Sequence, residues 1–97
     1  MSTKYPYPAA LLTYESAIEP IADKLYTRSI FDDESYVLLA KGEDRAADMF
    51  RECADRQTPK AEGLAEFVAQ LFGMDYDEVM DDAFKRANDI YEERKNG

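Results

Sequence analysis

The residues of this 97-residue chain best suited to chemistry are its carboxylates, and two clusters of them contain no Lys or Arg. One cluster is Asp32-Asp33-Glu34. The other is the stretch GMDYDEVMDD at residues 73–82, in which five of the ten residues are acidic. Carboxylates this close together can share a proton in acid–base catalysis, bind a metal ion or attract a cationic partner. The residues around them separate these three possibilities.

Catalysis is disfavoured by what accompanies the acids. The chain has no His, so a Ser or Cys nucleophile would lack an imidazole base. Cys53 lies on an apolar helical stripe, which is typical of a small core residue. A general acid needs an apolar pocket that raises the pKa of one carboxyl group, and a small charged helix offers no such pocket. We therefore expect no enzymatic activity.

Metal and cofactor sites are also disfavoured. Asp75-x-Asp77 begins like a calcium-binding loop, but Met80 occupies the position of the required Gly and Arg86 the position of the final Glu. Zinc would lack its usual Cys and His ligands. The segment LFGMDYDEV at 71–79 is similar to the acyl carrier proteins, yet Tyr76 replaces the Ser that carries their phosphopantetheine arm. We expect no cofactor.

The net charge points to a cationic partner. With 21 acids against 12 bases, the formal charge is −9, which disfavours direct binding to nucleic acid or to an anionic membrane. A single Cys excludes an intramolecular disulfide. No leader and no apolar run of membrane length are visible, so a cytoplasmic location is expected.

Apolar residues recur mostly at helical spacing, which predicts a mainly α fold in a single acidic domain of residues 1–97. An extended segment is expected at 1–8, because each residue before a proline is pushed out of the helical region. A first helix is expected from about 9 to 27, with Pro20 predicting a kink or a break. Its apolar stripe is Leu11, Tyr14, Ile18, Ile21 and Leu25.

Three further helical signals follow along the chain. Gly42-Glu43-Asp44 precedes the apolar stripe Ala46, Met49, Phe50 and Cys53. Thr58-Pro59 is a typical cap and first turn for the next helix, which Gly73 should end in the left-handed conformation. The apolar face of that helix is Leu64, Phe67, Val68, Leu71 and Phe72. Asp75 or Asp77 then caps a last helix, which extends to about residue 94 and is expected to bury Val79, Met80, Ala83, Phe84, Ala87, Ile90 and Tyr91.

Residues 30–41 are ambiguous, because a short apolar run does not distinguish a strand from a helix. Residues 36–40 could pair with residues 26–31 in a short β-hairpin around the acidic turn. Alternatively, Asp32 or Asp33 caps a short helix that Gly42 ends, and this second interpretation is preferred. The predicted fold is thus a small bundle of four to five helices, with a β-hairpin at 26–40 as the alternative.

The last predicted helix has a continuous acidic side opposite its apolar residues, formed by Glu78, Asp81, Asp82, Lys85, Asp89 and Glu92. Part of this charge is ordinary. Acids in a first turn stabilise the helix dipole, and Asp81 with Lys85 or Asp82 with Arg86 would form i,i+4 pairs. The excess between Asp75 and Asp82 is more than capping needs, and it suggests a missing cationic partner. A row of carboxylates on a rigid helix imitates the phosphates of a nucleic-acid strand.

The size, the acidity, the opening YPYP at 5–8 and the segment DDESYVLLAKG at 32–42 together resemble small phage-encoded anti-CRISPR proteins. The resemblance is to the DNA mimics that act on type I-F surveillance complexes. It implies a non-catalytic inhibitor in the bacterial host cell, which binds the basic DNA-binding surface on the large and backbone subunits of the Cascade (Csy) complex. The acids expected to make this contact are Asp32, Asp33, Glu34, Asp75, Asp77, Glu78, Asp81, Asp82, Asp89, Glu92 and Glu93.

Two other functions are compatible with the sequence. An antitoxin- or adaptor-like module would bind through an apolar surface and use its charge for solubility. Tyrosines are frequent interface anchors, and the candidates are Tyr5, Tyr7, Tyr26, Tyr36 and Tyr76. A phage structural or accessory protein would instead associate with itself.

Overall fold

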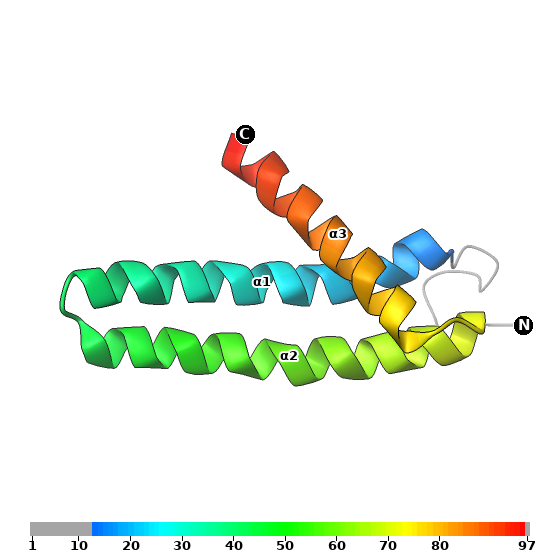
Figure 1. The fold of residues 1–97 in the computed structure, drawn as a ribbon, viewed down its shortest axis with the longest axis horizontal. Coiled ribbons are helices and arrows are strands. Elements are labelled where there is room, and N and C mark those ends of the chain that lie inside the picture. The colour runs from blue at the N-terminus through cyan, green and yellow to red at the C-terminus, as the bar shows by residue number, and fades with distance from the viewer. Residues whose placement is uncertain (1–12, 97) are drawn as a thin grey trace, which may run out of the picture.

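The computed structural model describes residues 13–96, so the expected extended segment at 1–8 lies outside the described residues. These residues form three helices, α1 (Tyr14–Ala40), α2 (Asp44–Phe72) and α3 (Tyr76–Asn96). The first two helices form a long antiparallel hairpin, and α3 crosses obliquely over it (Figure 1). The prediction of a mainly α domain is confirmed, but the described helices number three rather than four to five. None of them is long and apolar enough to cross a membrane.

The helix count was overestimated because Thr58-Pro59 begins no new helix and because residues 30–40 continue α1 rather than forming a separate helix. Pro20 lies inside α1 and Pro59 lies inside α2. A proline in a helix interior costs roughly 3 kcal/mol, but both helices continue because their next turns are buried. Ile21 and Ala22 follow Pro20 in the core, and Ala61 follows Pro59.

The predicted cap at Thr58 is therefore wrong. The Thr58 hydroxyl instead accepts a hydrogen bond from Arg28 Nη1 of α1 at 3.3 Å.

Residues 30–40 continue α1, so the alternative β-hairpin is excluded and Asp32 and Asp33 begin no helix. Phe31, Ser35 and Leu38 recur at helical spacing and face α2. Ser35 is buried and donates its hydroxyl to the Asp32 carbonyl at 2.7 Å, and the ring of Phe31 lies 5.9 Å from that of Phe50. Contact with α2 thus decides the conformation that the local sequence left open.

The ends of the helices follow the predicted turn chemistry. Gly42 (φ 79°) and Gly73 (φ 65°) are both left-handed and end α1 and α2, as predicted. Asp75 rather than Asp77 precedes α3, since its carbonyl accepts from the Val79 N–H at 3.1 Å.

The core lies where all three helices meet, and many of its residues are small. Ile18, Ile21, Ala22 and Leu25 of α1 pack against two groups of side chains from the other helices. These are Ala61, Ala65, Val68 and Ala69 of α2, with Val79, Ala83, Ala87 and Ile90 of α3.

Several predicted core residues lie elsewhere. Phe84 of α3 is 40% exposed beneath the Arg28 guanidinium, while Met80 and Tyr91 are half-buried. On α2, Phe67 and Leu71 are 62% and 49% exposed. Their side of α2 faces away from both neighbouring helices.

Candidate acidic binding surface

The outer side of α3 carries the acidic stripe that the sequence predicts. Val79, Ala83 and Ala87 hold the inner side of the helix against α1 and α2. The stripe is exposed and comprises Asp77, Glu78, Asp81, Asp89 and Glu92. No ion pair within residues 13–95 neutralises any of them, and the expected Asp81–Lys85 pair is not formed. Asp75, in the turn before the helix, is also exposed. This part of the predicted site is therefore available to a partner.

Asp82 belongs to the packing of α3 rather than to its exposed stripe. It is half-buried, and its Oδ2 accepts a hydrogen bond from the Tyr14 hydroxyl at 2.6 Å. Burial and this carboxylate both raise the pKa of Tyr14 above its ordinary value of 10.0. A carboxylate used in this way links α3 to α1, and its Oδ2 is already engaged by Tyr14.

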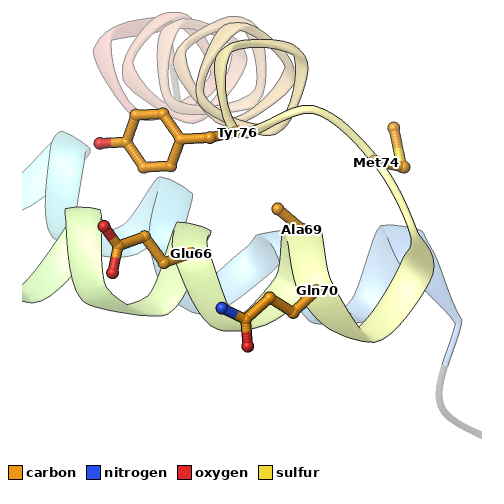
Figure 2. Close-up of a pocket in the computed structure, with 5 residues that line it drawn as sticks. All are labelled: Glu66, Ala69, Gln70, Met74 and Tyr76. Carbon is orange, nitrogen blue, oxygen red and sulfur yellow. The ribbon is translucent and has the colours of Figure 1, made fainter.

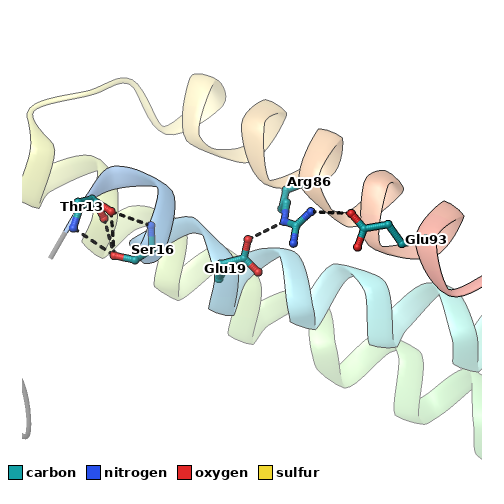
Figure 3. A network of polar contacts seen from close by, with 5 residues as sticks. All are labelled: Thr13, Ser16, Glu19, Arg86 and Glu93. Carbon is teal, nitrogen blue, oxygen red and sulfur yellow. Dashed lines mark hydrogen bonds and ion pairs between the residues drawn. The ribbon is translucent and has the colours of Figure 1, made fainter. Parts of the chain in front are cut away.

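Glu93 is likewise engaged, through an ion-pair network that links α1 and α3 (Figure 3). Arg86 Nε contacts Glu19 of α1 at 2.5 Å, and Arg86 Nη1 contacts Glu93 at 3.4 Å. The hydrogen bond to Glu19 is the main cause that raises the pKa of Arg86. The predicted Asp82–Arg86 pair is wrong, because the Asp82 carboxylate is directed to Tyr14 instead.

The cluster Asp32-Asp33-Glu34 does not form a patch. Consecutive residues on a helix point about 100° apart. Asp32 is half-buried, Glu34 is exposed on another side of α1, and Asp33 accepts a hydrogen bond from the Tyr91 hydroxyl at 3.0 Å. That bond is the largest cause that raises the pKa of Tyr91.

Asp33 therefore lies beside the C-terminal half of α3. Asp77, in the first turn of α3, lies fourteen residues before Tyr91, or about 21 Å along the axis at 1.5 Å per residue. The two predicted acidic clusters are consequently not brought together.

A second acidic stripe runs along α2 and was missed from the sequence. Its members are separated by four or seven residues and so lie on one side of the helix, with Arg51 as a base in the same arc. They are all exposed: Asp44, Asp48, Asp55, Glu62 and Glu66. The four- and seven-residue spacing of these acids can be seen in the sequence. The stripe was missed because a new helix was predicted to begin at Thr58-Pro59, which divided the acids between two helices.

The two stripes approach each other where α2 turns into α3. Burial is the largest cause that raises the pKa of Tyr76, in the first turn of α3. The nearby carboxylates of Glu62 and Glu66 raise it further. A hollow of about 390 Å³ opens here, lined by Glu66, Ala69, Gln70, Met74 and Tyr76 (Figure 2). A carboxylate beside an aromatic ring is an environment that suits the cationic head of an Arg or Lys side chain.

Within the described residues, no group of three or more Cys, Asp or Glu side chains is arranged to hold a metal ion. What the arrangement can do is attract positive charge over the exposed sides of α2 and α3. We name the two stripes together, Asp44, Asp48, Asp55, Glu62 and Glu66 with Asp77, Glu78, Asp81, Asp89 and Glu92, the acidic surface.

Comparisons with protein-family models, curated proteins and solved structures give no match.

Proposed function

We propose that this chain is a non-catalytic inhibitor that mimics DNA and blocks a CRISPR–Cas surveillance complex, in the manner of the anti-CRISPR proteins that it resembles. The observation that supports this proposal best is the acidic surface itself. Its carboxylates make no ion pairs among the described residues, although the chain has 12 bases. Carboxylates that repel one another on a rigid scaffold gain free energy when a cationic surface neutralises them.

The spacing along α2 suits a row of phosphate-binding side chains. Asp44 and Asp48 are about 6 Å apart along the helix axis, and Asp48 and Asp55 about 10.5 Å, at 1.5 Å per residue. Phosphates on one DNA strand are 3.4 Å apart along the duplex axis. The carboxylates therefore correspond to about every second or third phosphate, and basic residues spaced for a DNA backbone can reach several of them at once.

The expected partner is the Lys- and Arg-lined surface with which a type I complex, I-F in the first instance, grips target duplex. The large and backbone subunits supply this surface in the complexes to which the resemblance points. The hollow beside Tyr76 then receives one basic side chain of the partner. Neither nucleic acid nor a membrane is bound directly by the chain.

The test is an electrophoretic mobility shift of labelled duplex by purified type I-F complex, with and without prior addition of this protein. Loss of the shifted band and co-elution of the protein with the complex are expected. The inhibition should weaken steeply as salt is raised, because both surfaces regain screening counterions. Normal DNA binding by the complex in excess protein would refute the proposal for this target.

A pair of charge-matched variants separates the acidic surface from net charge. The triple variant Asp77→Asn, Glu78→Gln, Asp81→Asn removes three negative charges from α3. The control Asp23→Asn, Glu34→Gln, Glu43→Gln removes three from α1 and from the turn before α2, outside the two stripes. We expect the first to weaken inhibition at least about tenfold and the second to change it little. Equal effects would show that only overall charge matters.

An interaction module with an apolar contact is the second candidate, and Tyr36 is the observation that favours it. This side chain is 66% exposed, whereas Tyr26 and Tyr76 are half-buried, and Tyr5 and Tyr7 lie outside the described residues. If Tyr36→Ala abolished binding to a partner and salt had no effect on it, this second function would replace the first.

A further inference from the structure

An apolar surface lies on the side of the α1–α2 hairpin opposite to α3. On α2 it follows the residues that point away from Glu62 and Glu66, at about 100° per residue. Phe67 and Met49 are each 62% exposed there, and Leu71 is 49% exposed. Half-buried side chains connect them: Phe31 and Leu38 of α1 with Cys53 and Leu64 of α2. We call these seven residues the back face.

The back face holds large side chains that the monomer does not bury. Of its two phenylalanines, Phe67 is 62% exposed and Phe31 is half-buried. The largest fully buried side chains are instead Ile21, Val79 and Ser35. Large apolar side chains left exposed on one side of a small protein, with polar residues around them, are typical of a contact surface.

Charge distinguishes this surface from the rest of the molecule. By helical spacing, the exposed bases Arg56 and Lys60 lie on the same side of α2 as the back face, between Met49 and Phe67. The other charged residues on this side of the hairpin are Lys24, Arg45, Asp23, Glu34 and Glu52. The surface is thus close to neutral in a chain with a formal charge of −9. Two copies of so acidic a protein repel each other through most orientations, and the back face is where they can approach.

The size of the back face also suits a pair of copies. A 29-residue helix such as α2 is about 43 Å long, and two adjacent helices are about 20 Å wide. This whole side of the hairpin, its basic residues included, therefore has an outline of about 800 Å², which is comparable to the area per subunit of a standard stable interface.

We propose that a second copy of this chain covers the back face. Two hairpins packed on each other form a four-helix arrangement in which Phe67, Leu71 and Met49 become buried. A twofold axis makes the contact self-complementary, as in most homodimers. Both α3 helices and both acidic surfaces remain on the outside of the dimer, facing away from the shared contact.

Sedimentation equilibrium over a range of protein concentrations tests the proposal. We expect a species of twice the chain mass, and its dissociation constant should fall as salt rises, because salt screens repulsion between the two acidic copies. This salt dependence is opposite to that expected for binding to a basic partner, so failure of one proposal is distinguishable from failure of the other. A monomer at every concentration and salt would overturn the dimer.

Matched variants locate the contact. Phe67→Glu should raise the dimer dissociation constant at least about tenfold, because it places a charge in the buried interface. Tyr36→Glu changes a side chain of similar exposure (66% against 62%) on another side of α1, and should leave the constant unchanged. Both positions are exposed, so the monomer fold tolerates both. Equal effects, or none from Phe67→Glu, would remove the back face from the contact.

Cys53 provides an independent readout in the unmodified chain, since it is a free thiol within the back face. Its alkylation rate should decrease as protein concentration rises through the dissociation constant, and Phe67→Glu should abolish that decrease. A rate independent of concentration across the dimerisation range would contradict burial of this surface.

Discussion

The Tyr14 hydroxyl at the start of α1 donates a 2.6 Å hydrogen bond to Asp82 in the second turn of α3, across 68 positions of sequence. The same tyrosine stacks edge-on against Phe72 at the end of α2, with ring centroids 5.7 Å apart. Tyr14 therefore contacts both other helices at the end of the hairpin where α3 begins. Its position explains why one acid of the predicted stripe serves the fold.

Tyr14→Phe should lower the free energy of unfolding by about 1–2 kcal/mol, because it removes the hydrogen bond to Asp82 and leaves that half-buried carboxylate without its partner. Urea unfolding followed by circular dichroism measures the change. Tyr36→Phe is the matched control, since its hydroxyl is exposed and should be dispensable. Equal stability of the two variants would mean that the Tyr14–Asp82 bond contributes nothing net.

The same contact predicts a loss of stability in alkali. Burial and the Asp82 carboxylate raise the pKa of Tyr14 in the folded protein above its ordinary value of 10.0. Between these two pKa values the unfolded chain loses its proton and the folded chain keeps it, so unfolding becomes more favourable as pH rises. Stability should thus be intact below about pH 10 and fall above it. In Tyr14→Phe the decline should be shallower, and an unchanged slope would argue against this assignment.

The sequence predicted the local features of the fold better than the number of its helices. Gly42 and Gly73 end helices as expected, because a left-handed residue with no Cβ is a local requirement. Pro20 was expected to kink or break its helix and Pro59 to begin a new one, since a proline in a helix interior has a large local cost. The compensating burial of Ile21 and Ala61 comes from distant parts of the chain. This burial therefore cannot be predicted from the residues next to each proline in the sequence.

The acidic site was predicted in part for the same reason. The exposed acidic stripe of α3 can be predicted from the helical spacing of its apolar and acidic residues alone. The dispersal of Asp32, Asp33 and Glu34 depends on α1 continuing through them, and the stripe on α2 depends on that helix continuing past Pro59. Arg86 pairs with Glu19 rather than with Asp82 because of the way α3 crosses α1. Tertiary packing decides each of these.

Pro59→Ala tests whether α2 is continuous in solution. Alanine restores the backbone N–H that can donate to the Asp55 carbonyl, and it removes the steric clash of the proline ring. It also makes the unfolded chain more flexible, which offsets part of the gain. We expect the free energy of unfolding to rise by about 1–2 kcal/mol, measured by urea unfolding. A substantial loss of stability would indicate that Pro59 begins a separate helix, where its fixed φ is favourable.

The acidic stripe on α2 should contribute to inhibition as much as the stripe on α3. The variant Asp48→Asn, Asp55→Asn, Glu62→Gln removes three exposed carboxylates that have no ion-pair partner within the described residues. Stability should be unchanged or slightly higher, because repulsion along α2 decreases. Inhibition of DNA binding by the surveillance complex should weaken at least about tenfold, mainly through slower association. The control Asp23→Asn, Glu34→Gln, Glu43→Gln carries the same net charge. A different result would contradict this prediction: the α2 variant and the control inhibit like the unmodified protein, and only the α3 variant is impaired. The partner would then contact α3 alone, and α2 would not mimic a row of phosphates.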